Sequence, residues 1–162
     1  MSLSVREAGQ GDADALWALL GPVFRAGETY AVPRDIGRAE ALGFWCAPGA
    51  RVWLAEQGDC ALGTAYLKPN QRGGGDHVAN AGFVTAPEAA GQGVATALLD
   101  RVLAEARAAG FAAMQFNFVV ETNARAIALW RRAGFETVGR LPGAFRHPVA
   151  GEVDALVMHR RL

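Results

Sequence analysis

Residues 84–96 read Val-Thr-Ala-Pro-Glu-Ala-Ala-Gly-Gln-Gly-Val-Ala-Thr, and they connect a predicted strand to the longest predicted helix of the chain. The first turn of a helix carries backbone N–H groups without partners inside the helix, and the helix dipole makes that end positive. Gly91 and Gly93 can adopt backbone conformations that other residues avoid, and they let a ligand approach the backbone closely. The segment therefore predicts a binding site for an anionic group such as a phosphate.

The residues around the glycines fit the same prediction, because Ala95 is too small to crowd a phosphate and Thr96 adds a hydroxyl group. We expect a phosphate-bearing cofactor to contact a continuous run: Gly91, Gln92, Gly93, Val94, Ala95 and Thr96. A plain turn and a dinucleotide-binding fingerprint are the alternatives. The fingerprint fits less well, because it needs a small residue in place of Thr96 and an acidic residue near the end of the next strand, 111–120, which has none.

Hydrophobic periodicity divides the rest of the chain into strands and helices. The expected strands are 2–7, 51–56, 60–68, 77–85, 111–120, 135–139 and 153–159, and the expected helices are 13–20, 36–45, 91–109 and 122–133. The first helix is expected to stop before Gly21-Pro22, because proline disrupts a helix interior, with continuation to Phe24 as the alternative. A loop rich in proline and glycine is expected to separate the last two strands.

This order of elements predicts the fold class. The early strands are joined by hairpin-type turns and favour antiparallel pairing, whereas the strand–helix–strand units after residue 77 favour parallel pairing. We expect an α/β fold of the α+β type: a mixed, mostly antiparallel twisted sheet of six to seven strands flanked by four helices. Residues 1–162 are expected to form a single domain.

The amino-acid composition indicates which classes of binding partner to expect. The chain has 162 residues, of which 51% are hydrophobic and 20% charged, and its formal net charge is zero. This composition is that of a globular domain and gives no sign of a nucleic-acid or membrane partner. Cys46 and Cys60 have no metal-type spacing, and residues 1–7 do not form a signal-peptide pattern. We expect a cytoplasmic protein with reduced thiols and no metal.

The stretch 84–95 resembles the acyl-coenzyme A motif of the GNAT family of N-acetyltransferases, whose core is Gln/Arg-x-x-Gly-x-Gly/Ala. In this sequence the core falls on Ala90, Gly93 and Ala95. Ala90 departs from the family pattern, and the missing side chain removes one expected phosphate contact. Gln92 is a candidate to replace it.

A second segment, 123–135, resembles the family's Asn-x-x-Ala-x-x-Leu-Tyr-x-x-x-Gly-Phe helix. The resemblance implies that Asn123 faces the pantetheine or phosphate region of the cofactor. Trp130 stands where many relatives have a tyrosine that can protonate the leaving thiolate. Tryptophan is only an N–H donor, so Trp130 is expected to pack beside the cofactor or in the core. A thiol has a pKa of about 8.5 and can leave as the thiolate without a general acid.

The resemblance implies acetyl-coenzyme A (acetyl-CoA) as co-substrate and a fold similar to that of acyl-CoA N-acyltransferases. It places the oxyanion donor on backbone N–H groups near Phe83 and Val84 and implies direct attack of a neutral amine on the thioester. The chain is similar to a subgroup that acts on proline analogues and other small amines. A small-molecule amine is therefore the expected acceptor, and a homodimer is one option for the assembly. A non-catalytic acyl-CoA sensor and a protein N-acetyltransferase are the alternatives.

Three polar residues are candidates for the acceptor side. Asn80 lies in the strand before the turn that contains Gly91 and Gly93, which is called the glycine turn below. Relatives have a glutamate at this place in the strand, and Asn80 could orient a water or the acceptor. Asn117 and Gln115 share one face of the strand 111–120 by two-residue alternation, and Asn117 is the preferred acceptor-site residue. Glu121 follows that strand and is a candidate general base. A structural amide, or for Glu121 a solvated carboxylate at a helix start, is the alternative in each case.

Overall fold

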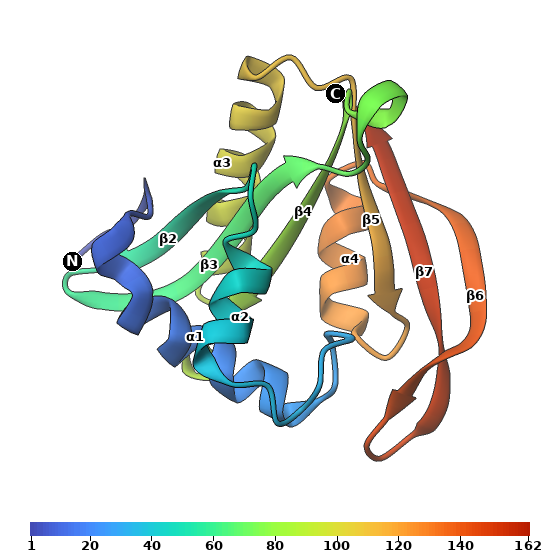
Figure 1. Cartoon of the computed structure of the whole chain (residues 1–162), viewed down its shortest axis with the longest axis horizontal. Coiled ribbons are helices and arrows are strands. Elements are labelled where there is room, and N and C mark those ends of the chain that lie inside the picture. Colours follow the sequence, from blue (N-terminus) through green and yellow to red (C-terminus); the bar gives the residue numbers. More distant parts are fainter.

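The computed structural model describes residues 1–162 and contains one sheet of seven strands (Figure 1). The strands are β1 Leu3–Glu7, β2 Arg51–Gln57, β3 Cys60–Pro69, β4 Val78–Thr85, β5 Ala113–Val120, β6 Glu136–His147 and β7 Gly151–Arg161. The α-helices are α1 Ala13–Ala26, α2 Arg38–Trp45, α3 Val94–Ala108 and α4 Ala124–Arg132. Short 3-10 turns cover Gln10–Asp12, Gly73–Gly75 and Pro87–Ala89.

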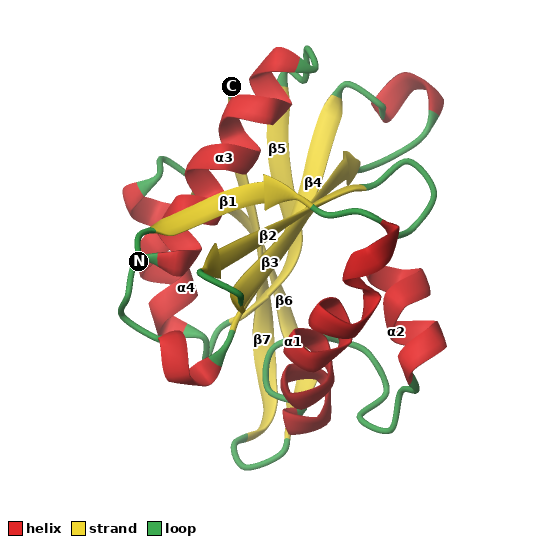
Figure 2. Cartoon of the chain, turned by 90° about the vertical axis from the view of Figure 1, so that its left-hand side faces the viewer, coloured by secondary structure: helices red, strands yellow, loops and turns green.

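The sheet has the strand order β1-β2-β3-β4-β5-β7-β6, in which only β4 and β5 are parallel neighbours. Figure 2 shows α1 and α2 on one face of the sheet and α3 and α4 on the other. This arrangement confirms the predicted fold class, a mostly antiparallel mixed sheet with helices on both faces. None of the helices combines the length and the apolar character needed to cross a lipid bilayer.

The parallel neighbours β4 and β5 part soon after they meet. They pair only at Val78–Ala113 and Ala79–Met114, so the rest of β4 lacks a partner on that side. The backbone hydrogen bonds of Val78 and Ala86 are made with residues on the β3 side of β4. On the other side, the His77 carbonyl accepts a hydrogen bond from the Ala112 N–H, just before β5. Because backbone groups alternate along a strand, the groups of Ala81, Phe83 and Thr85 project into the opening. The opening is therefore lined by a strand edge that a ligand can pair with.

A glycine in β3 leaves room for helix α3 to lie close to the sheet. A Cβ added at Gly63 in β3 would lie 2.7 Å from Val94 Cγ1, 2.9 Å from the Val84 carbonyl oxygen and 3.1 Å from Leu98 Cδ1. The carbonyl belongs to the backbone of β4 and cannot move without moving the strand. The absence of a side chain at this position therefore lets the first turn of α3 approach the sheet.

We expect Gly63→Ala to lower the free energy of unfolding by about 1–3 kcal/mol, because the added methyl overpacks the contact between α3 and the sheet. Gly43→Ala in α2 is the matched control, because a Cβ there meets no atom within 4 Å. In a helix interior this change should stabilise by about 0.5–1 kcal/mol. Urea unfolding measures both, and the same sign for both variants would contradict this account.

Two helices begin or end where the sequence did not place the boundary. Helix α1 continues through Pro22 to Ala26, so the expected stop before Gly21-Pro22 is wrong. Burial of Phe24, which is fully enclosed, favours the continuation, and Gly27 ends the helix with φ 67° while its N–H bonds to the Phe24 carbonyl. Helix α3 begins at Val94, so Gly91 lies in the preceding turn instead of the helix.

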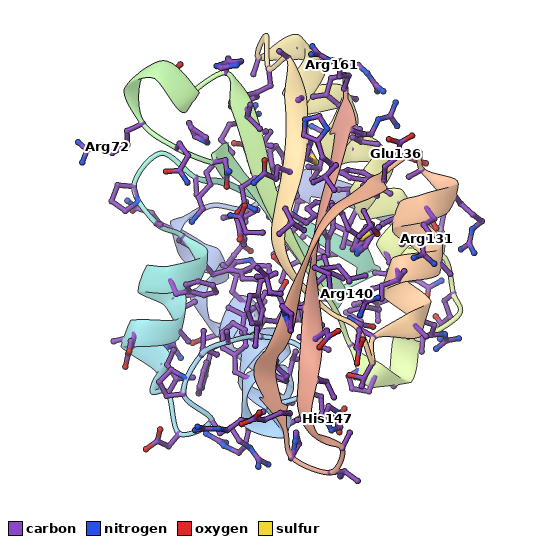
Figure 3. All side chains as sticks on the ribbon, turned by 90° about the vertical axis from the view of Figure 1, so that its right-hand side faces the viewer. Arg72, Arg131, Glu136, Arg140, His147 and Arg161 are labelled. Carbon is purple, nitrogen blue, oxygen red and sulfur yellow. The ribbon has the colours of Figure 1, made fainter.

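The expected loop after residue 139 is also wrong. Residues 136–147 form the continuous strand β6, which pairs with β7 along a long hairpin. A register shift between Leu141 and Phe145 accommodates Pro142 and Gly143. Because β6 is the edge strand, a residue without an N–H donor is tolerated there. Figure 3 shows His147 at the tip of this hairpin, where its Nδ1 accepts bonds from the N–H groups of Val149 and Ala150.

Candidate active site

A cavity of about 920 Å³ lies where β4 and β5 part, and it is lined by both strands and by the starts of α3 and α4. Its wall contains most of the residues predicted as site residues, which are Asn80, Phe83, Val84, Gly91, Gly93, Val94, Ala95, Thr96, Asn117, Asn123 and Trp130. The two predicted residues outside this wall are Gln92 and Glu121. The structure thus gathers the glycine turn, the β4 edge and the polar face of β5 around one space.

The glycine turn has the geometry of an anion site. Gly91 and Gly93 have φ angles of 79° and 80°, which only glycine adopts without strain. The N–H groups of Gly91, Gly93 and residues 94–96 donate to no backbone acceptor, whereas the Gln92 N–H bonds to the Ala89 carbonyl. A Cβ at Gly93 would meet no atom within 4 Å, so the space in front of the turn is open. These free donors at the positive end of α3 fit the phosphates of a coenzyme A.

Gln92 does not take part in this arrangement. Its side-chain amide donates to the Glu88 carbonyl at 3.1 Å, and it lies outside the cavity wall. The expectation that Gln92 replaces the side chain missing at Ala90 is therefore not supported by the geometry. Arg125, in the first turn of α4, lies nearer the turn, with Nη2 3.6 Å from the position of a Cβ at Gly91.

Backbone groups of Phe83 on the β4 edge are engaged by Tyr30. The Phe83 N–H donates to the Tyr30 hydroxyl, which in turn donates to the Phe83 carbonyl, both over 2.9 Å. Burial raises the pKa of Tyr30 well above its usual range, so the phenol is neutral. By strand alternation, the backbone of Val84 faces its partner Thr64 in β3. Of the two predicted donors, Phe83 is thus the one whose N–H faces the opening.

Trp130 in α4 and Asn123, the residue before this helix, both line the cavity. The Trp130 ring is mostly buried and lies 4.9 Å from the Phe83 ring and 4.8 Å from the Phe116 ring, measured between centroids. It therefore belongs both to the core and to the cavity wall. Asn123 precedes the first turn of α4, but its side chain makes no capping bond with the helix. Its amide is consequently free to bond a ligand.

A chain of polar side chains bridges the point where β4 and β5 part. Asn80 is mostly buried: its Oδ1 accepts from the Tyr66 hydroxyl at 2.9 Å and its Nδ2 donates to the Gln115 carbonyl at 3.0 Å. The Tyr66 ring occupies the space where Gly82 lacks a side chain, since a Cβ there would be 2.2 Å from Tyr66 Cε2. Asn80 thus joins the two strands through its side chain, and both its polar groups are occupied.

Asn117 lies in a β-bulge. The register with β7 shifts between Phe116 and Val119, so β5 carries one more residue than its partner there. Asn117 is exposed at the cavity, where its Oδ1 accepts from Gln115 and its Nδ2 donates to Asn70. The bond with Gln115 agrees with the predicted shared face, but strict alternation ends at the bulge. Bulges of this kind re-aim side chains next to active sites.

Glu121 lies apart from these residues. Its carboxylate accepts from Arg140 at 2.8 Å, and it lines a separate, smaller cavity that also contains Arg131. Figure 3 shows Arg140 on β6, on the side of the hairpin next to α4. Arg140 also binds Asp154 at 2.7 Å, and the Gly143 N–H together with Arg140 lowers the pKa of that carboxyl. The structure therefore assigns Glu121 to an ion-pair network outside the main cavity.

The structure brings further residues to the cavity that sequence reasoning missed. The wall contains one carboxylate, Glu28, and the ammonium of Lys68, which lies 5.2 Å from the Tyr66 ring centre. Lys68 is paired with Asn80 across β3 and β4, so the two side chains share a face. Alternation in β3 with the aromatic Tyr66 could have indicated Lys68. No local pattern marks Glu28, which lies in the segment between α1 and α2.

Comparisons with known proteins agree with the fold. The model of the acetyltransferase (GNAT) family matches residues 14–135. The N-acetyltransferase aca1 of Schizosaccharomyces pombe is 36% identical over 97 residues. This match covers 59% of the present chain and 46% of the yeast protein, so the chain spans less than half the length of that relative.

Two solved structures are similar over nearly the whole chain. A GCN5-related N-acetyltransferase from Kribbella flavida is 41% identical, with a TM-score of 0.94 over 99% of this chain and 98% of that one. A ribosomal-protein-alanine N-acetyltransferase from Brucella melitensis is 26% identical, with a TM-score of 0.83 over 98% and 99%. With the glycine turn, the parted strands and the helix that carries Asn123 and Trp130 in place, the chain belongs to the acetyltransferase (GNAT) family, whose co-substrate is acetyl-CoA.

Proposed function

We propose that this protein transfers an acetyl group from acetyl-CoA to the nitrogen of a small-molecule amine by direct attack of the amine on the thioester. One observation carries the proposal: the free N–H donors of the glycine turn and the polar side chains at the parting of β4 and β5 line one continuous cavity. Residues that bind a cofactor and an acceptor thus share a space, and holding two reactants together supplies much of the rate in such reactions.

Acetyl-CoA supplies the activated acetyl thioester, and the protein supplies orientation and charge stabilisation. The N–H of Phe83 points into the opening, where it can stabilise negative charge that develops on a carbonyl oxygen. In the present structure that donor is used by Tyr30, so the Tyr30 hydroxyl must release it before it can serve the substrate. Trp130 packs against Phe83 and keeps this part of the wall apolar.

The acceptor side combines Asn117 with a cation. Asn117 is exposed in the cavity wall and can bond the acceptor by exchanging its contacts with Gln115 and Asn70. Lys68 forms no salt bridge within the chain and is only partly exposed. An unpaired ammonium beside polar amides favours an acceptor that carries an anionic group as well as its amine.

The proton of the amine needs an acceptor, since a primary amine with a pKa of about 10 is mostly protonated at neutral pH. Burial raises the pKa of Tyr66 to about 12, so its hydroxyl does not serve as a base at neutral pH. Glu28 is the one carboxylate in the cavity wall. We assign proton acceptance to Glu28, directly or through water.

A thiol-release screen with acetyl-CoA and a panel of amines tests the proposal. The panel pairs each amino acid with the amine that lacks its carboxylate, and we expect turnover with amino acids and at least tenfold less with their partners. Binding of acetyl-CoA without turnover of any amine would show a sensor and refute the catalytic proposal.

A protein acceptor is the second candidate, favoured by the similarity to the ribosomal-protein-alanine N-acetyltransferase. Labelled acetyl-CoA is offered with a protein extract and with small amines in separate reactions. Label in the protein pool alone would reject the small-molecule assignment. The cytoplasmic location and the single domain over residues 1–162 stay predictions of the sequence.

A further inference from the structure

Arg125 is positioned over the glycine turn from a distant part of the chain. It occupies the first turn of α4, and its Nη2 lies 3.6 Å from where a Cβ at Gly91 would stand. Arg125 lines the main cavity together with Gly91, Gly93 and the first residues of α3. The guanidinium thus faces the same space as the free N–H groups of the turn.

Neither a carboxylate nor a carbonyl of the chain uses this guanidinium. The salt bridges of the chain involve other arginines, namely Arg6, Arg38, Arg51, Arg101 and Arg140. The side-chain hydrogen bonds likewise do not include Arg125. An arginine that is exposed, unpaired and next to open backbone donors can form bidentate bonds with a phosphate at little cost in lost internal contacts.

The turn itself has no positively charged side chain to meet a diphosphate. Ala90 ends in a methyl group, and the Gln92 amide is bonded to the Glu88 carbonyl. Backbone N–H groups and a helix dipole supply partial charges only, whereas the diphosphate of a coenzyme A carries two negative charges. The first turn of α4 is the element that brings a full positive charge to this place.

We propose that the Arg125 guanidinium binds the diphosphate of acetyl-CoA, making from α4 the charged contact that Ala90 cannot make from the turn. The inference rests on acetyl-CoA being the co-substrate. It assigns to Arg125 a binding role and no part in the acetyl-transfer step. The contact closes the cofactor site between two helices, α3 and α4, that are separated in sequence by the whole of β5.

Calorimetric titration with coenzyme A tests this assignment without reference to turnover. We expect Arg125→Ala to weaken affinity about 10- to 50-fold, because a charge-assisted bond is lost. Arg107→Ala is the matched control: it removes the same charge at the far end of α3, about 20 Å along the helix from Val94. We expect the control to change affinity less than twofold, and equal losses in both variants would overturn the proposal.

Two further titrations identify which phosphate Arg125 binds and test whether an arginine at position 90 can replace it. Dephospho-coenzyme A lacks the 3′-phosphate and keeps the diphosphate, so Arg125→Ala should weaken it by the same factor. Loss confined to intact coenzyme A would show a 3′-phosphate contact and overturn the assignment. Ala90 is exposed, and adding Ala90→Arg to Arg125→Ala should restore most of the affinity.

Failure of the inference and failure of the proposed function have different signatures. If Arg125→Ala binds coenzyme A as tightly as the wild type, Arg125 has no such role, while the acetyl-transfer function stands. If the wild type itself binds no coenzyme A, both the function and the inference fail. Thermal melting of each variant confirms that it is folded, as expected for an exposed side chain.

Discussion

Gly93→Glu is expected to abolish acetyl-CoA binding, with a loss of more than about 100-fold in affinity, which corresponds to about 2.7 kcal/mol. The new carboxylate would stand in the open space before the free N–H groups of the turn, which is the proposed position of the cofactor phosphates, and would repel them. The backbone at this position has φ 80°, and a non-glycine residue there costs about 1–2 kcal/mol of stability. The protein should therefore stay folded but lose the cofactor, as measured by titration calorimetry with coenzyme A.

Gly49→Glu is the matched control for this experiment. Gly49 also has a positive φ, 85°, and a Cβ there meets no atom within 4 Å, but it does not line the cavity. This variant should show a similar loss of stability and unchanged coenzyme A affinity. Unaltered binding by Gly93→Glu would end the role assigned to the turn.

Asn117→Ala is expected to lower kcat/KM for the amine about 10- to 100-fold while changing coenzyme A affinity less than about twofold. The expected loss is that of a hydrogen bond to a polar or charged substrate group, about 1.5–3 kcal/mol. Because Asn117 is exposed and its partners Gln115 and Asn70 can turn to water, stability should change by less than about 0.5 kcal/mol. Steady-state kinetics with varied amine and fixed saturating acetyl-CoA measure the effect.

Asn70→Ala separates binding from positioning at this site. Asn70 accepts a bond from Asn117 at 2.7 Å but does not line the cavity. Its loss should reduce turnover less than the loss of Asn117 itself. Kinetics of Asn117→Ala indistinguishable from the wild type would remove Asn117 from the acceptor site.

Local sequence signals were sufficient to predict the glycine turn and the two helices that follow it in the chain. The glycine turn, the helix that follows it and the Asn123 helix depend on backbone conformation and caps within a few residues. Gly91 and Gly93 have positive φ angles, which glycine adopts readily. Gly134, which follows the end of α4, has a φ of 89°. Such features need few distant contacts, so a single sequence can indicate them.

Errors arose where distant contacts override local preference. Pro22 predicted a helix end, but burial of Phe24 in the core favours the longer helix. Pro142 and Gly143 predicted a loop, but they lie on an edge strand that tolerates both. Alternation placed Asn117 correctly beside Gln115, yet the bulge after Phe116 is created by pairing with β7 and has no local signal.

The sequence by itself determined the order of elements, the sheet class and the glycine turn before α3, because periodicity and glycine conformations are properties of neighbouring residues. Only the tertiary structure decided which side chains share the cavity. It placed Arg125 over Gly91, placed Lys68 beside Asn80 on one face of the sheet, and paired Glu121 with Arg140 outside the cavity. These pairings depend on where β5 parts from β4 and on how the β6–β7 hairpin packs, and such long-range geometry is fixed by the packing of the whole chain.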